Sequence, residues 1–309
     1  MNVVKPITIR AAQLTSSTVP YPDTGETAWS SAAVAYAVGA TVSYTVDGLI
    51  RKFECKTAHT SNATNFPVPY PNETANWLDL GAVNRYNMFH LERNTQTVAN
   101  SPYVFEITPG DRFGALGFGG VEADSIRVEV YNGATQIYDT TRDMIDRSVA
   151  SWYDFFYQPL RQVRSAAFFD LPVSTTYKAK VTMTKASGQV KCGLFVAGMP
   201  LEIGDTEYRA GARILNFSEI SRDVFGEAKI TKRRSIPKTV QNVIIKKERL
   251  NAVIEIFNDL NAEVALWSGL SNPLDAFFDG LFIIGFYKDI DFSIDNAAEA
   301  SAGIELEQI

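Results

Sequence analysis

Residues that commonly carry out nucleophilic or acid–base chemistry are scarce in this 309-residue chain. There are 2 histidines, His59 and His90, and 2 cysteines, Cys55 and Cys192. Neither histidine lies in a GxSxG or HExxH motif, and no CxxC or Cys/His spacing predicts a zinc site. We therefore expect no metal site, no cofactor and no histidine-based catalysis. We interpret the two cysteines as buried thiols.

Carboxylates and glycines are the remaining candidates for chemistry. Glycoside hydrolysis needs two carboxylates at a defined separation in a cleft, and sequence spacing does not establish such a separation in a β-rich chain. The glycine-rich segment 114–125 has neither a GxGxxG pattern nor a GK[ST] ending, so it predicts a tight loop in a sheet. The available carboxylate pairs are Asp139 with Asp143, Asp275 with Asp279, and Glu202 with Asp205. We predict no catalytic residues and no enzymatic activity.

Composition and charge limit the class of protein further. Hydrophobic residues make up 46% and charged residues 21% of the chain, which is typical of a globular protein. The net charge of −6 argues against a chain that mainly coats nucleic acid or an anionic membrane.

The start, MNVVKPITIR, has no apolar h-region and alternates like an edge strand. The apolar run 281–287 is far shorter than the ~20 residues that cross a bilayer. We expect synthesis in a cytoplasm and no membrane insertion.

The pattern of side chains predicts a mainly β fold. Segments such as SIRVEVYNG, YKAKVTMTKASG and KTVQNVIIKKE alternate with a period of two and end in turn residues. One amphipathic helix is predicted over 248–260. We predict three domains. Residues 1–85 form a small aromatic-rich β module, 86–205 a β-sandwich, and 206–309 an α+β domain with that helix on one face of a sheet whose strands lie near 240–245, 262–267 and 281–286.

The first region carries a set of aromatic residues and glycines in a recognisable order: Ala28-Trp29, Tyr36, Gly39, Val42, Tyr44, Gly48, Phe53 and Trp77. In these residues the region resembles the small chitin-binding modules of bacterial chitinases. The family binds sugar through exposed rings just after the strand that corresponds to 53–56, where this chain has Thr57-Ala58-His59-Thr60. Two interpretations are open for Trp29, Tyr36 and Trp77: they are packing residues of a docking module, or they are candidate glycan-binding residues.

The same module, followed at once by the segment NRYNMFH at 84–90, is similar to a family of virion structural proteins from tailed bacteriophages. Segments 151–160, 199–226 and 284–294 fit this resemblance. It implies a non-enzymatic tail or baseplate component of the virion that joins tail proteins or fibres through symmetric copies. Its partners would be other copies of itself and other tail proteins. The alternative is a receptor-recognition protein whose first region binds a host surface glycan.

The segment SWYDFFYQPL, residues 151–160, is unusually rich in aromatic residues. It contains more rings than one face of a strand can bury. Two interpretations are open: a loop folded over its own domain edge, or an anchor for a subunit interface, since aromatic residues dominate interface energetics. The candidate interface residues here are Trp152, Tyr153, Phe155, Phe156 and Tyr157.

Charge is distributed unevenly in the third region. Residues 229–249 are basic and include Arg233 and Arg234, whereas residues from 289 onward are acidic. The basic residues either belong to a solvated strand pair or form an interface with the acidic segment of another copy or another tail protein. The lack of interleaved aromatic residues in the basic run disfavours nucleic acid as a partner.

Overall fold

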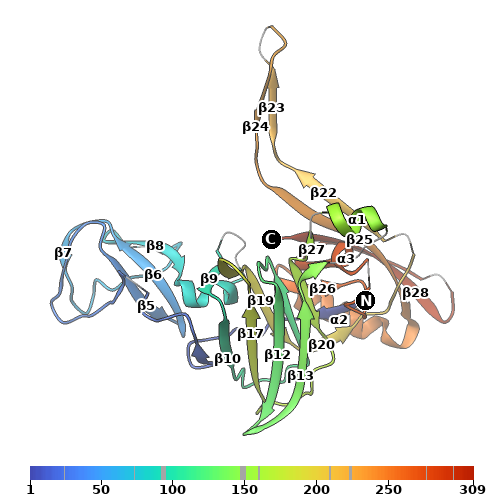
Figure 1. Cartoon of the computed structure of the whole chain (residues 1–309), viewed down its shortest axis with the longest axis horizontal. Helices are drawn as coiled ribbons and strands as arrows, with labels where there is room; N and C mark the ends of the chain where they lie inside the picture. The colour runs from blue at the N-terminus through green and yellow to red at the C-terminus, as the bar shows by residue number, and fades with distance from the viewer. Residues whose placement is uncertain are drawn as a thin grey trace. The chain divides into compact units, whose positions relative to one another are not determined.

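The computed structural model describes residues 1–309 except 24, 73, 92–94, 147–150, 159–160, 209, 223–224, 276 and 295. The fold is mainly β, as the sequence predicts (Figure 1). The chain divides into two compact units. One consists of Met1–Pro6, Ala167–Phe169 and Val196–Ile309, and the other of Ile7–Ala166 and Asp170–Phe195. No helix in the described part of the chain is long and apolar enough to span a membrane.

The aromatic-rich module is a four-stranded sheet with the order β3-β5-β6-β8 and a small β4–β7 pair. A tight turn joins β5 to β6, and both Asp47 and Gly48 have positive φ, as a two-residue hairpin requires. The core of the module is formed by Tyr36, Val42, Phe53, Cys55 and Trp77. The strands are β3 Thr27–Ala28, β4 Ala35–Tyr36, β5 Thr41–Val46, β6 Leu49–Cys55, β7 His59–Thr60 and β8 Trp77–Ala82.

The unit of Ile7–Ala166 and Asp170–Phe195, which includes the aromatic-rich module, also contains a five-stranded sheet and most of a three-stranded sheet, and side chains from the two sheets contact each other. The larger sheet has the order β13-β12-β17-β10-β2 and the smaller one β16-β11-β19. Phe105 on β10 contacts Phe195 on β19 with ring centroids 5.4 Å apart, and Phe118 on β11 contacts the same ring at 5.2 Å. These contacts form the core of the predicted β-sandwich.

The sandwich strands have the following bounds. The larger sheet contains β2 Leu14–Ser17, β10 Tyr103–Ile107, β12 Ser125–Asn132, β13 Thr135–Asp143 and β17 Lys178–Thr184. The smaller sheet contains β11 Ala115–Gly119, β16 Ser165–Phe168 and β19 Leu194–Gly198. A separate pair consists of β9 Thr97–Asn100 and β18 Gln189–Cys192, and the 3-10 helix η1 spans Asn84–Phe89.

The other unit is built on one mixed-length antiparallel sheet with the order β20-β1-β26-β27-β28-β25-β21, in which β22 also pairs with β25. Its elements are β1 Asn2–Val4, β20 Pro200–Glu202, β21 Asp205–Thr206, β22 Gly211–Asn216, β25 Ser235–Lys246, η2 Lys247–Arg249, α2 Leu250–Asp259, β26 Ala265–Ser268, α3 Phe278–Leu281, β27 Phe282–Ile294 and β28 Glu299–Gln308. The predicted order of strand, helix, strand, strand is therefore present.

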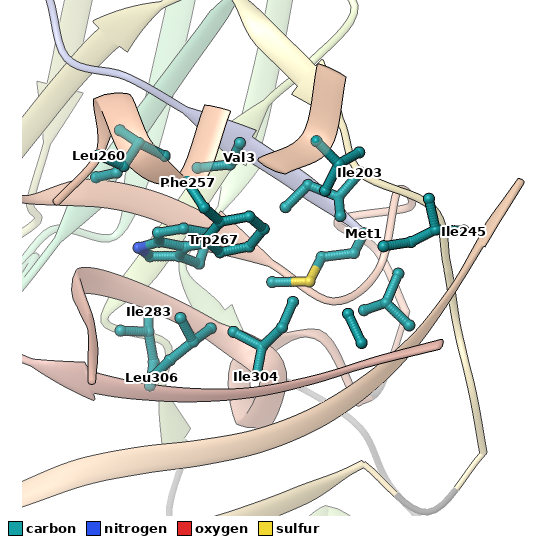
Figure 2. Packing of buried hydrophobic residues seen from close by; sticks show 14 residues of the cluster. Met1, Val3, Ile203, Ile245, Phe257, Leu260, Trp267, Ile283, Ile304 and Leu306 are labelled. Atoms are coloured by element: carbon teal, nitrogen blue, oxygen red, sulfur yellow. The ribbon is translucent and has the colours of Figure 1, made fainter. Parts of the chain in front are cut away.

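Helix α2 packs on one face of this sheet, as its apolar stripe predicts. The ring of Phe257 on α2 stacks on Trp267 of β26 with centroids 5.6 Å apart. Tyr287 on β27 donates a hydrogen bond of 3.1 Å to the Phe257 carbonyl oxygen. Figure 2 shows Trp267 and Phe257 surrounded by aliphatic side chains from several strands, with Met1 in the same cluster. Burial of these side chains is the main source of this unit's stability.

The first residues of the chain do not form the edge strand that we predicted. Strand β1 pairs with β20 on one side and β26 on the other, and Val3 and Val4 are fully buried. Strand β2 joins the sandwich through β10. Residues 1–85 therefore contribute to four different sheets rather than to one module. The reason is that strand pairing is non-local, so the side-chain pattern of a strand does not specify its neighbours.

A two-stranded extension continues β22 and β25 beyond the sheet. We call residues 211–237 the arm. It contains β22, β23 Glu219–Arg222, β24 Ala228–Thr231 and the start of β25. Strands β22 and β25 pair from Gly211 opposite Val240 to Asn216 opposite Ser235, and β23 pairs only with β24. In Figure 1 the β23–β24 pair projects away from the sheet.

Candidate interaction surfaces

Cys55 and His59 lie together, but their geometry does not produce a nucleophile. Cys55 Sγ is 3.6 Å from His59 Nδ1, and that nitrogen is also 2.8 Å from the Thr57 carbonyl oxygen. A contact with a carbonyl oxygen requires the proton on Nδ1, so this nitrogen has no lone pair to accept the thiol proton. Burial raises the pKa of the Cys55 thiol, and it raises the pKa of Cys192 to about 12. Both cysteines are buried, unpaired thiols.

The described residues contain no group of three or more His, Cys, Asp or Glu side chains that could hold a metal ion. His90 is a second isolated histidine. Burial, together with the nearby charge of Arg51, lowers its pKa to about 4, while Asp79 acts in the opposite direction. The neutral ring is therefore the stable form in the fold near neutral pH.

Two of the three glycan-binding candidates are buried in the core of the module. Trp77 is 0% exposed, and its indole donates a hydrogen bond of 2.8 Å to the Asn65 carbonyl oxygen. Tyr36 contacts Trp77 edge to face with ring centroids 5.2 Å apart. Neither ring offers a face on which a sugar could stack. The packing interpretation describes these two residues, and Trp29 is the one candidate that stays half-exposed.

Trp29 packs at the margin of the same core. Its ring contacts Tyr44 edge to face at 5.1 Å, and Tyr44 lies 6.2 Å from Phe66. Both Tyr44 and Trp29 rest against the buried cluster of the module. Of the three rings that the glycan-binding alternative requires, Trp29 alone is therefore partly accessible.

The aromatic segment 151–160 forms a short helix, α1 Trp152–Tyr157, in its described part; residues 159 and 160 lie outside the described residues. The Ser151 hydroxyl caps the helix by accepting a hydrogen bond of 3.1 Å from the Asp154 backbone N–H. Strands β14 Ile145–Asp146 and β15 Arg161–Gln162 pair on either side of this excursion. In the chain, the helix thus lies between two strands that pair with each other.

All five rings of α1 are exposed, between 63% for Phe155 and 80% for Trp152. They contact mainly one another: Tyr153 and Tyr157 have centroids 4.9 Å apart, and Phe155 and Phe156 are 5.1 Å apart. No α1 residue is buried. The interpretation of a loop folded over its own domain edge is therefore wrong, and the rings form an exposed aromatic cluster of the kind found at interfaces.

The arm presents a second exposed apolar surface, which the sequence analysis missed. Ile220 lies directly opposite Ile230, and every residue of β23 and β24 is exposed. Ile214 and Phe217 continue this surface toward the sheet. Full burial of one such side chain contributes about 1.5–3 kcal/mol, and an isolated two-stranded hairpin is marginally stable in water. The sequence signal is one isoleucine in each strand close to a basic residue, which also fits a strand with one buried face.

The basic and acidic segments of the third region meet within one chain, which corrects the interpretation that they meet across different copies or different tail proteins. Strand β25 pairs with β28 from Lys238 opposite Glu307 to Lys246 opposite Glu299. Lys238 forms an ion pair with Glu305, and Lys288 Nζ lies 3.8 Å from the same carboxylate. The reason is that adjacent antiparallel strands place their outward side chains side by side. Asp295, also part of the acidic segment, lies outside the described residues.

Arg233 and Arg234 lie in the arm, apart from this internal charge pairing. Arg233 forms an ion pair of 2.6 Å with Glu219, and both side chains are more than half exposed. The Arg234 carbonyl oxygen accepts a hydrogen bond of 3.3 Å from the Phe217 N–H, which holds the base of the arm together. Both arginines are exposed.

No protein-family model matches the sequence, and no curated protein matches it.

Proposed function

We propose that this chain is a non-enzymatic structural component of a tailed-phage virion, in the tail or baseplate, that joins tail proteins or fibres through symmetric copies. It would be synthesised in the host cytoplasm and incorporated into the particle. The resemblance of the module and the following segments supports the phage context. The exposed arm supports an assembly role.

One observation carries the assembly role. The arm ends in the paired strands β23 and β24, whose isoleucines are exposed to solvent. Among the described residues, no other strand or helix covers this pair. Apolar side chains on an isolated hairpin gain stability only when another surface removes them from water. The exposed rings of α1 add a second surface of the same kind. A chain with two such surfaces is suited to binding neighbours.

Quantitative mass spectrometry of purified virions tests the proposal. Particles of the phage that encodes the chain should contain it at a fixed, multiple copy number after washing at physiological ionic strength. A matched preparation from a phage lacking the gene controls for contamination by host-cell protein. Absence of the chain from washed particles, or trace amounts that vary between preparations, would contradict the proposed function.

A further inference from the structure

The arm and the remainder of the chain carry opposite net charges. Residues 211–237 contain 6 basic residues and 3 acidic residues, a net charge of +3. The whole chain has a net charge of −6, so the other residues sum to −9. Two arms would therefore repel each other. The charge of the arm favours an acidic surface, which the same polypeptide supplies.

A specific acidic surface of suitable form lies along β27. Strand β26 pairs only with the first part of β27, from Phe282 to Gly285, whereas β28 continues alongside to Ile294. Among the described strands, none pairs with the other edge of β27 between Phe286 and Phe292. This segment is an open sheet edge, which can accept a further strand.

The charges on this edge suit a basic strand. Ile290 and Phe292 pack against the core, where the Phe292 ring contacts Phe257 of α2, and the alternating Asp289 and Asp291 are exposed. The exposed Lys288 on the same segment lies 3.8 Å from Glu305 of β28, so its charge is offset within the sheet. Acidic side chains protect an open edge from uncharged or acidic strands, and they attract a strand that carries lysine and arginine. The arm carries exposed Lys229, Lys232 and Arg234.

The arm cannot reach this edge of its own sheet as the strands are arranged. The order β27-β28-β25-β22 separates the base of the arm from β27 by two strands. The projecting β23–β24 pair also extends away from the sheet in Figure 1. The edge of a second copy is therefore the accessible one.

We propose that the arm of one copy docks on the acidic β27 edge, Phe286 to Phe292, of a second copy of this chain. The contact joins two different surfaces, so each copy offers one arm and one edge and the contact can repeat around a ring or along a stack. Backbone pairing with the open edge supplies a register, and the arm's isoleucines are removed from water. This inference rests on the proposed assembly function and names its partner.

A charge swap in the full-length protein tests the docking. The arm variant carries Lys232→Glu and Arg234→Glu and retains the Arg233–Glu219 pair. The edge variant carries Asp289→Lys and Asp291→Lys. The matched control for the arm variant carries Lys246→Glu and Lys247→Glu. It changes the net charge by the same amount as the arm variant, at exposed positions outside the arm. Circular dichroism melting shows whether each protein is folded, and sedimentation velocity measures association.

We expect the wild type to associate at about 50 mM salt and to dissociate at about 0.5 M salt, because screening weakens attraction between exposed charges. The arm variant and the edge variant should each associate at least about tenfold more weakly on their own. An equimolar mixture of the two should recover association, because the acidic arm of one then meets the basic edge of the other. The control should behave like the wild type.

Several results would overturn the docking. These are a monomeric wild type at every salt concentration, no recovery in the mixture, or an equal loss of association in the control. An arm variant that associates normally but no longer binds duplex DNA would assign the arm to nucleic acid instead. If virions contain the chain and the mixture does not recover, the docking fails and the proposed function stands. If the mixture recovers association and virions lack the chain, the docking stands and the proposed function fails.

Discussion

Lys238 on β25 forms an ion pair with Glu305 on β28, the neighbouring strand of the same sheet. The Lys238 side chain is only 12% exposed. Lys288 on β27 approaches the same carboxylate from the other side. Glu305 therefore connects three adjacent strands, and part of the charge asymmetry between the basic and acidic segments stabilises the fold of one molecule.

A double-mutant cycle should detect this coupling. We expect Lys238→Met to lower the free energy of unfolding by about 1–2 kcal/mol, because it leaves a partly buried carboxylate without its closest cation. Glu305→Gln should cost about 1 kcal/mol, and the double variant should cost less than the sum. Urea denaturation measures each value. Lys246→Met, at an exposed position of the same strand, is the control and should stay within about 0.5 kcal/mol of the wild type. Additive single effects would contradict the coupling.

The aromatic module should depend on Trp77 for stability rather than for binding. Trp77→Ala should destabilise the module by about 3–5 kcal/mol, since it removes a fully buried ring and leaves the Asn65 carbonyl oxygen without its donor. Tyr70→Ala, at a ring that is 78% exposed, should change stability by less than about 0.5 kcal/mol. Denaturation followed by tryptophan fluorescence compares the two. Equal stability of the Trp77 variant and the wild type would show that the ring does not belong to the core.

Local patterns predicted the elements well, and the reason is physical. The helix over 248–260 and the strands beside it follow from side-chain periodicity, which reports the buried face of an element. The partner of each strand does not follow from it. Strand β1 has the pattern of an edge strand, yet it lies between β20 and β26 because residues nearly 200 and more than 260 positions away complete the sheet on either side.

For the candidate surfaces too, the sequence indicated which segments are unusual but not whether their side chains are buried or exposed. Aromatic content indicated α1, but a count of rings does not distinguish a buried loop from an exposed helix. Trp77 has the residue type used both for stacking on sugar and for core packing, so its role depended on burial. The isoleucines of the arm were missed because alternation predicts one buried face, and β23 and β24 have none.

His90 should make the fold sensitive to mild acid. Its pKa is lowered to about 4 in the folded chain, against 6.5 as the ordinary value, so below about pH 6.5 the unfolded chain binds the proton more readily. The free energy of unfolding should therefore fall by about 1–2 kcal/mol between about pH 7 and about pH 5. Urea midpoints at the two pH values measure this. His90→Gln should remove most of the difference, and an unchanged pH dependence in that variant would contradict the assignment.

The rings of α1 should matter for assembly and not for folding. We expect the double variant Trp152→Ser, Phe156→Ser to melt within about 0.5 kcal/mol of the wild type, because neither ring is buried. Its incorporation into virions, measured by complementation of a phage lacking the gene, should fall at least about tenfold, as expected for the loss of two aromatic anchors. Tyr70→Ser serves as a control for loss of an exposed ring elsewhere. Normal incorporation of the α1 variant would remove α1 from the interface.

Hydrogen–deuterium exchange of the arm, measured by mass spectrometry, tests the proposed assembly role of the arm most directly. In the isolated chain, backbone amides of β23 and β24 should exchange rapidly, because the pair is exposed on both faces. In the assembled virion the same peptides should be protected at least about tenfold, while peptides from the buried strand β26 should be protected in both states. Equally rapid exchange of the arm in the isolated chain and in the virion would contradict an assembly role for it.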